Sequence, residues 1–303
     1  MDKKGIFVYL GVTYAGAFLL IPLLMHMKLI VFTEPNILNN IVFLLAMWIP
    51  ALGAVIAAKA SPNDAVPRFA LWPLPKGPAV RIALVVLLAY AVTYTIGALF
   101  GWTRVQWDMG TLMNQISGTQ QQPLPPGVTA IAPAIALVGG LIISVLLGLT
   151  VFAFLALGSE LGWRGYLLPR LMPLGRFRAY AMTGVLWGLW FLPLIYGSYR
   201  EIGQPPVVWI TALEFVAMGV ALSAVLGEIW RRTGHLGLVA VAAGSFAVHL
   251  QGIWDHLFQM GKDPWTGPFG VIAILVWTAV ALLPGLMSSR KPQTGTGQPE
   301  GQA

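Results

Sequence analysis

Long apolar stretches, separated by short polar segments that contain proline or glycine, follow one another along most of the chain. A helix that crosses a bilayer needs about 20 mainly apolar residues. The pattern therefore predicts an all-α, polytopic membrane protein with eight transmembrane helices. We place them at residues 5–25, 38–58, 82–101, 130–157, 179–197, 207–229, 236–258 and 268–287.

Composition excludes the two main alternatives, a soluble domain and a disordered chain. Apolar residues make up 57% of the 303 residues, only 10% are charged, and the mean hydropathy is +0.76. Soluble domains carry about 25% charged residues, and disorder requires low hydrophobicity. With no internal repeat visible, we expect one transmembrane domain over residues 1–287.

Two segments lack the apolar pattern. The loop at 102–127 ends in the polar, proline-rich run QQQPLPPG and is predicted to be an irregular external loop. Residues 288–303 are mostly Gly, Gln, Pro and Thr, which predicts a disordered cytoplasmic tail.

The positions of the 18 Lys and Arg residues predict the orientation. Fourteen fall on one side of the predicted spans, and four, Lys28, Arg104, Arg200 and Lys262, fall on the other. The positive-inside rule then places both termini in the cytoplasm of a multi-pass cell-membrane protein. The same distribution explains the net charge of +7 by membrane orientation, so no nucleic-acid partner is expected. The chain has no Cys, which excludes thiolate chemistry, and we expect no metal and no cofactor.

Ionisable side chains inside or close to the ends of the predicted spans are the candidates for function, because a charge at bilayer depth costs about 2.5–3.5 kcal/mol to insert. They are Glu160, Arg164, Glu214, Glu228, His249, Asp255 and His256.

The spacing of these residues suggests local partners for some of them. Glu160 and Arg164 are four residues apart and can pair on one helix face, either as a structural ion pair or as part of an intramembrane active site. Glu228 precedes two arginines by three and four residues, which favours an ion pair at the membrane boundary.

The remaining candidates have no such partner in sequence. Glu214 has no cation within a helical turn, so it is either protonated or faces a wet cavity. His249 and His256 are seven residues apart and share a helix face, with Asp255 beside the second. Interfacial placement is favoured for these three over an acid/base or metal site.

Four sequence elements, in order, resemble the motifs of the CPBP family, which includes the CAAX proteases and bacteriocin-processing enzymes. The most distinctive is SELGWRGYLLPRL, similar to the family's first motif, Glu-Glu-x-x-x-Arg. The resemblance covers about residues 40–250, and its elements are Trp48–Leu52, Ser159–Leu171, Gly184–Leu194 and the stretch from Arg232–Gly234 to Ser245–Phe246.

The resemblance implies an eight-helix bundle and an intramembrane endopeptidase that acts on membrane-associated or prenylated peptides. In the family's proposed mechanism, the first Glu is the general base for a water, and His and Asn side chains assist and stabilise the oxyanion; older interpretations made the Glu and His residues metal ligands. Some bacterial relatives are linked to bacteriocin self-immunity.

This sequence departs from the family pattern at each aligned proton-handling position. Ser159 takes the place of the first Glu, Phe191 and Ala243 take the places of the two His residues, and Ala247 takes the place of Asn. Of the motif, Glu160 and Arg164 remain. A phenyl ring and two methyl groups cannot transfer protons, and Ser159 has no His at an aligned position to activate it.

Three hypotheses follow. The first is a pseudoenzyme that keeps the cavity and binds a membrane peptide or lipidated protein tail without cutting it. The second is an active protease with a relocated site, in which Glu160 is the base and Glu214, His249 or His256 assists. The third is a transporter or channel-like protein, since intramembrane carboxylates also mark ion paths, although the chain shows no inverted repeat.

Overall fold

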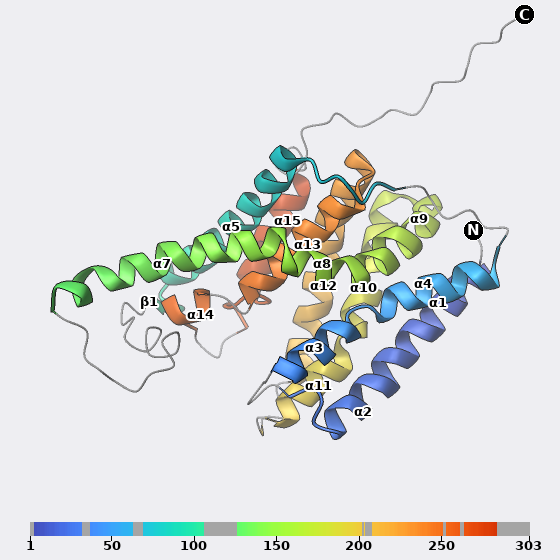
Figure 1. Cartoon of the computed structure of the whole chain (residues 1–303), viewed down its shortest axis with the longest axis horizontal. Helices are drawn as coiled ribbons and strands as arrows, with labels where there is room; N and C mark the ends of the chain where they lie inside the picture. The colour runs from blue at the N-terminus through green and yellow to red at the C-terminus, as the bar shows by residue number, and fades with distance from the viewer. Residues whose placement is uncertain are drawn as a thin grey trace, which may run out of the picture.

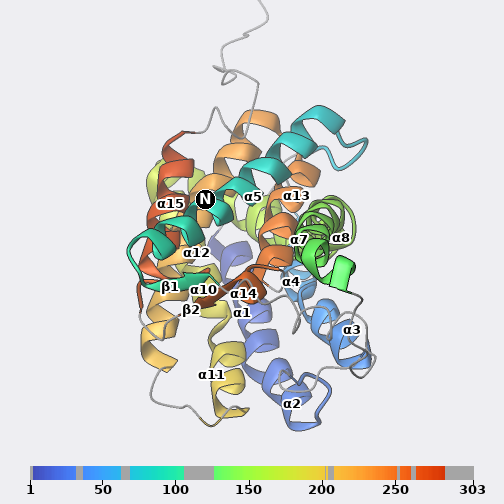
Figure 2. The ribbon, with the colours of Figure 1, turned by 90° about the vertical axis from the view of Figure 1, so that its left-hand side faces the viewer.

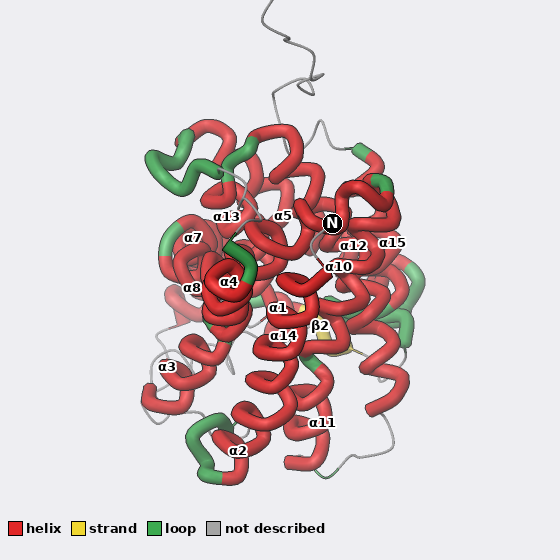
Figure 3. Tube along the Cα trace, turned by 90° about the vertical axis from the view of Figure 1, so that its right-hand side faces the viewer, coloured by secondary structure: helices red, strands yellow, loops and turns green. Residues whose placement is uncertain are grey.

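The computed structural model describes residues 3–31, 37–62, 69–105, 126–201, 203, 208–250, 253–260 and 264–283. Helices dominate these residues (Figures 1 and 3). The first half of the chain forms α1 (Lys3–Ala15), the π-helical η1 (Gly16–Leu20), α2 (Ile21–His26), α3 (Ile37–Ala46), α4 (Ile49–Ala60), α5 (Lys76–Leu99) and α7 (Pro126–Leu149).

The second half is also helical and contains the family-like motifs. Its elements are α8 (Val151–Glu160), the π-helical η2 (Leu161–Leu167), α9 (Leu168–Leu171), the 3₁₀ turn η3 (Met172–Leu174), α10 (Arg176–Trp190), α11 (Leu192–Glu201), α12 (Val208–Thr233), α13 (Leu236–Leu250), α14 (Trp254–Leu257) and α15 (Val271–Leu282).

The helix lengths confirm an all-α membrane protein but not the number of spans. Among the described residues, five helices are long and apolar enough to cross a bilayer: Lys3–His26, Ile41–Ala60, Lys76–Leu99, Arg176–Glu201 and Trp209–Thr233. A bent pair, Leu137–Leu149 with Val151–Leu174, makes a sixth if it is one span. The last two predicted spans contain the shorter helices α13 and α15, which fall below the usual spanning length.

A bend of 41° lies inside the span predicted at residues 130–157. It falls at Thr150, between α7 and α8, where the Thr150 hydroxyl donates a hydrogen bond of 2.7 Å to the carbonyl oxygen of Leu146. Threonine bonds of this kind to a carbonyl one turn earlier often bend helices. The bend directs α8 toward the centre of the molecule, where the family-like motif begins.

A short antiparallel strand pair joins the two loops that follow α5 and α14. Strand β1 (Thr103–Val105) pairs with β2 (Phe258–Met260), with Arg104 opposite Gln259. The loop at 102–127 is predicted to be irregular, so β1 is not foreseen by the sequence. Residues 106–125 of that loop and the predicted disordered tail at 288–303 lie outside the described residues.

Two clusters of buried apolar side chains form the core. One lies among α5, α12, α13 and α15, and the other among α1, α4, η2, α9 and α10. Figure 2 shows α5, α13 and α15 in the upper half of the view and α1 and α2 in the lower half. Trp187 and Trp230 pack against both clusters and connect them.

Glycines allow α10 and α12 to approach each other closely. A Cβ added at Gly184 would lie 2.6 Å from the carbonyl oxygen of Gly219, and one at Gly188 would lie 2.7 Å from the Cα of Val216. Gly184 and Gly188 are spaced as in the GxxxG pattern of membrane helix pairs, in which missing side chains allow backbone contact.

We expect Gly184→Ala to lower the free energy of unfolding by about 1–3 kcal/mol, because the new methyl group meets backbone that cannot rotate away. The measurement is thermal unfolding in detergent. Gly11→Ala is the matched control, because a Cβ there has no heavy atom within 4 Å apart from its own helix and chain neighbours. Equal melting temperatures for wild type and Gly184→Ala would contradict the backbone contact.

Candidate functional site

Glu160 and Arg164 form a buried ion pair where α8 passes into the π-helical segment η2. The Arg164 Nη1 donates a hydrogen bond of 2.9 Å to Glu160 Oε1, and the two side chains are 0% and 1% exposed, respectively. The pairing predicted from their spacing is confirmed. Short π-helical segments inside α-helices are frequent at functional sites.

Aromatic rings and α4 surround this pair. The Arg164 guanidinium carbon lies 5.1 Å from the centre of the Trp187 ring on α10. On the other side, a Cβ at Gly162 would lie 2.6 Å from the carbonyl oxygen of Pro50, so η2 packs directly on the start of α4. Two of the family-like elements, Trp48–Leu52 and Ser159–Leu171, are thus in contact.

The pair leaves polar atoms without partners. Within the described residues, Glu160 Oε2 and the Nε and Nη2 of Arg164 are buried and have no hydrogen-bond partner. Such atoms are costly in an apolar interior. The carboxylate therefore keeps one acceptor oxygen available beside the guanidinium.

A cavity of about 520 Å³ lies beside Glu160. Side chains from α3, α8, α10, α11, α12, α13 and α15 line it. The structure brings five of the motif positions to this one cavity: Ser159, Glu160, Phe191, Ala243 and Ala247. Arg164 contacts Glu160 but is not among the described lining residues.

The cavity is mainly apolar and aromatic. Among its described lining residues, hydroxyl and carboxyl groups come from Ser159, Glu160, Ser198, Tyr199 and Thr211. The last two bind each other, because the hydroxyl oxygens of Tyr199 and Thr211 lie 2.8 Å apart. The Glu160 carboxylate could accept a hydrogen bond. The described lining beside it has few other groups that could transfer a proton.

Phe191, which the motif resemblance aligns with a family His, makes aromatic contacts. Its ring centre lies 5.5 Å from that of Trp187, 5.0 Å from that of Trp190 and 6.0 Å from that of Phe215. This wall packs as a small aromatic cluster. On α13, Ala243 and Ala247 line the cavity with their methyl groups.

The residues suggested for a relocated site do not share this cavity in the described structure. Glu214 is half-buried on α12 and is not among the lining residues. His249 is buried on α13, where its Nδ1 lies 3.2 Å from the indole Nε1 of Trp254 and its ring packs 5.1 Å from that of Tyr90. The side chains of Asp255 and His256 lie outside the described residues.

No group of three or more His, Asp or Glu side chains that could hold a metal ion occurs among the described residues. Among the described residues, the charged groups of this site are the Glu160 carboxylate and the buried Arg164 guanidinium.

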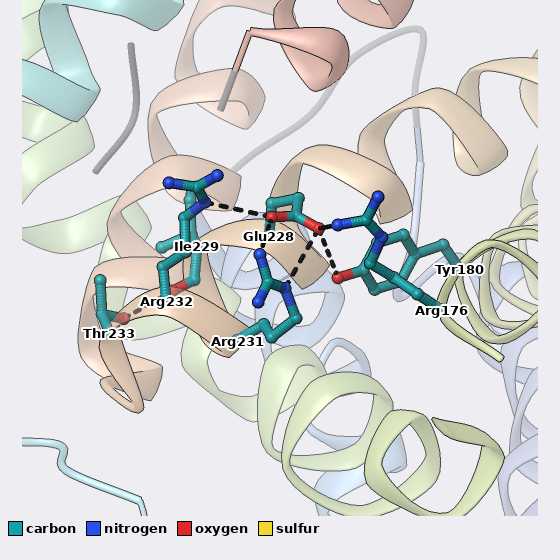
Figure 4. Close-up of polar contacts among 7 residues, drawn as sticks. All are labelled: Arg176, Tyr180, Glu228, Ile229, Arg231, Arg232 and Thr233. Carbon is teal, nitrogen blue, oxygen red and sulfur yellow. Dashed lines mark hydrogen bonds and ion pairs between the residues drawn. The ribbon is translucent and has the colours of Figure 1, made fainter. Parts of the chain in front are cut away.

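A second charged cluster surrounds Glu228 near the end of α12 (Figure 4). The ion pairs predicted with Arg231 and Arg232 are confirmed. Sequence reasoning missed two further partners from α10, Arg176 and Tyr180. No spacing rule could have found them, because they precede Glu228 by about fifty residues and meet it only when α10 packs on α12.

Comparison with known proteins identifies a family for part of the chain. Residues 141–285 match the family described as type II CAAX prenyl endopeptidase Rce1-like. No curated protein matches the chain. The match confirms the resemblance recognised from the motifs and covers three of the four elements.

We expect Arg164→Ala to lower the free energy of unfolding by about 3–5 kcal/mol, because it leaves the Glu160 carboxylate buried without its partner. Thermal unfolding in detergent measures the effect. The matched control is the double variant Glu160→Leu/Arg164→Met, which removes both charges and should recover most of the loss. If Arg164→Ala is as stable as wild type, the pair does not hold this junction.

Proposed function

Because residues 141–285 form an Rce1-like domain, we propose that the protein is a catalytically silent relative of the CAAX proteases that uses the same cavity to bind rather than to cut. One observation supports this most directly. Ser159, Phe191, Ala243 and Ala247 line a single cavity beside Glu160, so the replaced positions are gathered where the family's chemistry would occur.

The described cavity lining lacks groups that the hydrolysis of a peptide bond usually requires. A general base needs a water within hydrogen-bond reach and a group that stabilises the developing oxyanion. Glu160 can accept a hydrogen bond through Oε2, but its Oε1 is already bound to Arg164. Phe191, Ala243 and Ala247 offer neither a proton donor nor a dipole toward a reacting carbonyl.

Binding, in contrast, suits the cavity. Its lining is mostly apolar, and its volume of about 520 Å³ falls within the range of small-ligand sites. An apolar peptide or the lipid of a modified protein tail would be buried there, beside Glu160. We propose a membrane peptide or lipidated protein tail as the ligand.

The membrane topology is part of the proposal. We propose that α13 and α15 cross the bilayer with the six longer units, which gives eight spans in one domain over residues 1–287, and that both termini are cytoplasmic. Their 15 and 12 residues would reach about 22 and 18 Å. Contact with α5 and α12 supports this, because neighbouring helices would cover their shorter ends.

The two alternatives have less support. An active protease built on Glu160 with Glu214 or His249 requires these groups to meet, and neither lines the described cavity with Glu160. A transporter requires a polar path, whereas the described cavity wall is mainly apolar. A role in bacteriocin self-immunity stays a prediction from the family resemblance.

The first test is a cleavage assay with purified protein in detergent against a panel of prenylated and membrane-spanning peptides, with and without a chelator. We expect no cleavage above the detergent blank in either condition. Glu160→Gln serves as the control for any signal that does occur. Cleavage by wild type that Glu160→Gln abolishes would overturn the silent-enzyme proposal.

The second test measures binding of a fluorescent lipidated peptide. We expect Ala243→Leu to weaken it by at least about tenfold, or about 1.4 kcal/mol, because the larger side chain fills the cavity. Val138→Phe is the control, since Val138 is 55% exposed on α7 and lies outside the lining. Equal loss in both variants would show that the peptide binds elsewhere.

A further inference from the structure

The cluster around Glu228 carries more positive charge than its carboxylate can neutralise. Arg231 alone contacts both oxygens, through Nη2 to Oε2 at 2.8 Å and Nε to Oε1 at 3.3 Å. The Tyr180 hydroxyl donates a further hydrogen bond of 3.0 Å to Oε1. One arginine and one tyrosine therefore satisfy this carboxylate.

Two more arginines nevertheless reach the same carboxylate. Arg232 Nε donates to Oε2 at 3.2 Å, and Arg176 Nη1 lies 3.4 Å from Oε1. Three guanidinium groups thus surround one carboxylate, an excess of two positive charges. Figure 4 shows the three arginines approaching Glu228 from α10 and from the end of α12.

The two additional arginines are partly open to their surroundings. The side chain of Arg176 is 44% exposed and that of Arg232 is 16% exposed. Within the described residues, the terminal nitrogens of Arg232 have no hydrogen-bond acceptor. These nitrogens can donate to a further anion without breaking the contacts to Glu228.

The cluster lies at the membrane end of two helices. α10 starts the apolar helix Arg176–Glu201, and α12 contains the whole apolar helix Trp209–Thr233. Arg176 and Arg232 therefore lie at the ends of these helices. Phe177, next to Arg176, is 69% exposed, and its ring centre lies 4.5 Å from the Arg176 guanidinium carbon. An exposed aromatic ring beside cations is typical of the boundary between headgroups and acyl chains.

We propose that Arg176 and Arg232 bind the phosphate of an anionic phospholipid, with Phe177 against the start of its acyl chains. Basic pockets between transmembrane helices recognise such headgroups, and a guanidinium can give a phosphate two parallel hydrogen bonds. Glu228 positions the two arginines, and the closely packed α10 and α12 hold them at one level. This site is separate from the cavity and does not depend on the proposed function.

The test measures thermal stabilisation of the detergent-purified protein by phosphatidylglycerol, with phosphatidylcholine and inorganic phosphate as separate arms. We expect phosphatidylglycerol to raise the melting temperature in a saturable way, and the other two to have little effect. In Arg176→Gln/Arg232→Gln, the apparent affinity should fall by about 25-fold, at roughly a fivefold loss for each arginine. This variant keeps the Arg231 and Tyr180 contacts to Glu228.

Arg104→Gln is the control. It removes one positive charge from an exposed side chain in β1, shortly after the C-terminal end of α5. We expect it to bind phosphatidylglycerol like wild type. Arg176→Lys/Arg232→Lys retains the charge and decides the question if the Gln variant does not fold: saturable stabilisation by phosphatidylglycerol supports the site, and its absence overturns it. Equal affinity for phosphatidylglycerol in wild type and the Gln variant, or competition by inorganic phosphate at equal affinity, would also overturn it.

Discussion

The buried contact between Glu160 and Arg164 is the interaction on which the central architecture depends. Neither charge could remain at this depth alone, because the cost of desolvating an isolated ion is recovered only when a partner is in place. The contact fixes the junction of α8 and η2, against which α4, α10 and α13 pack. Glu160 itself lines the cavity.

Beside Glu160, the cavity has the volume of a ligand site but a mainly apolar wall. A membrane interior favours the loss of polar groups that no longer have a partner or a reaction to serve. Under the proposed binding function, the aromatic cluster at Phe191 and the methyl groups of α13 would follow this rule. Glu160 is the exception, because removing it would leave Arg164 buried alone.

Structural features that depend on residues close in sequence could be predicted. Features that depend on tertiary contact could not. Apolar runs predicted the helices, and spacing predicted the pairs of Glu160 with Arg164 and of Glu228 with Arg231. The bend at Thr150 has a local cause, but a threonine does not always bend a helix, so its presence alone did not predict one. The pairing of β1 with β2 and the contact of Arg176 with Glu228 join distant segments, which no periodicity reports.

The glycine contacts restrict how a molecule could reach the cavity from the lipid. α10 cannot part from α12 without breaking backbone contact at Gly184, and α8 and α13 are tied in the same way, because a Cβ at Gly244 would meet the backbone of Phe152 and Ala153. On α3, Phe43 and Leu44 line the cavity with side chains. A molecule entering from the lipid between α10 and α12, or between α8 and α13, would have to separate backbone that is in direct contact.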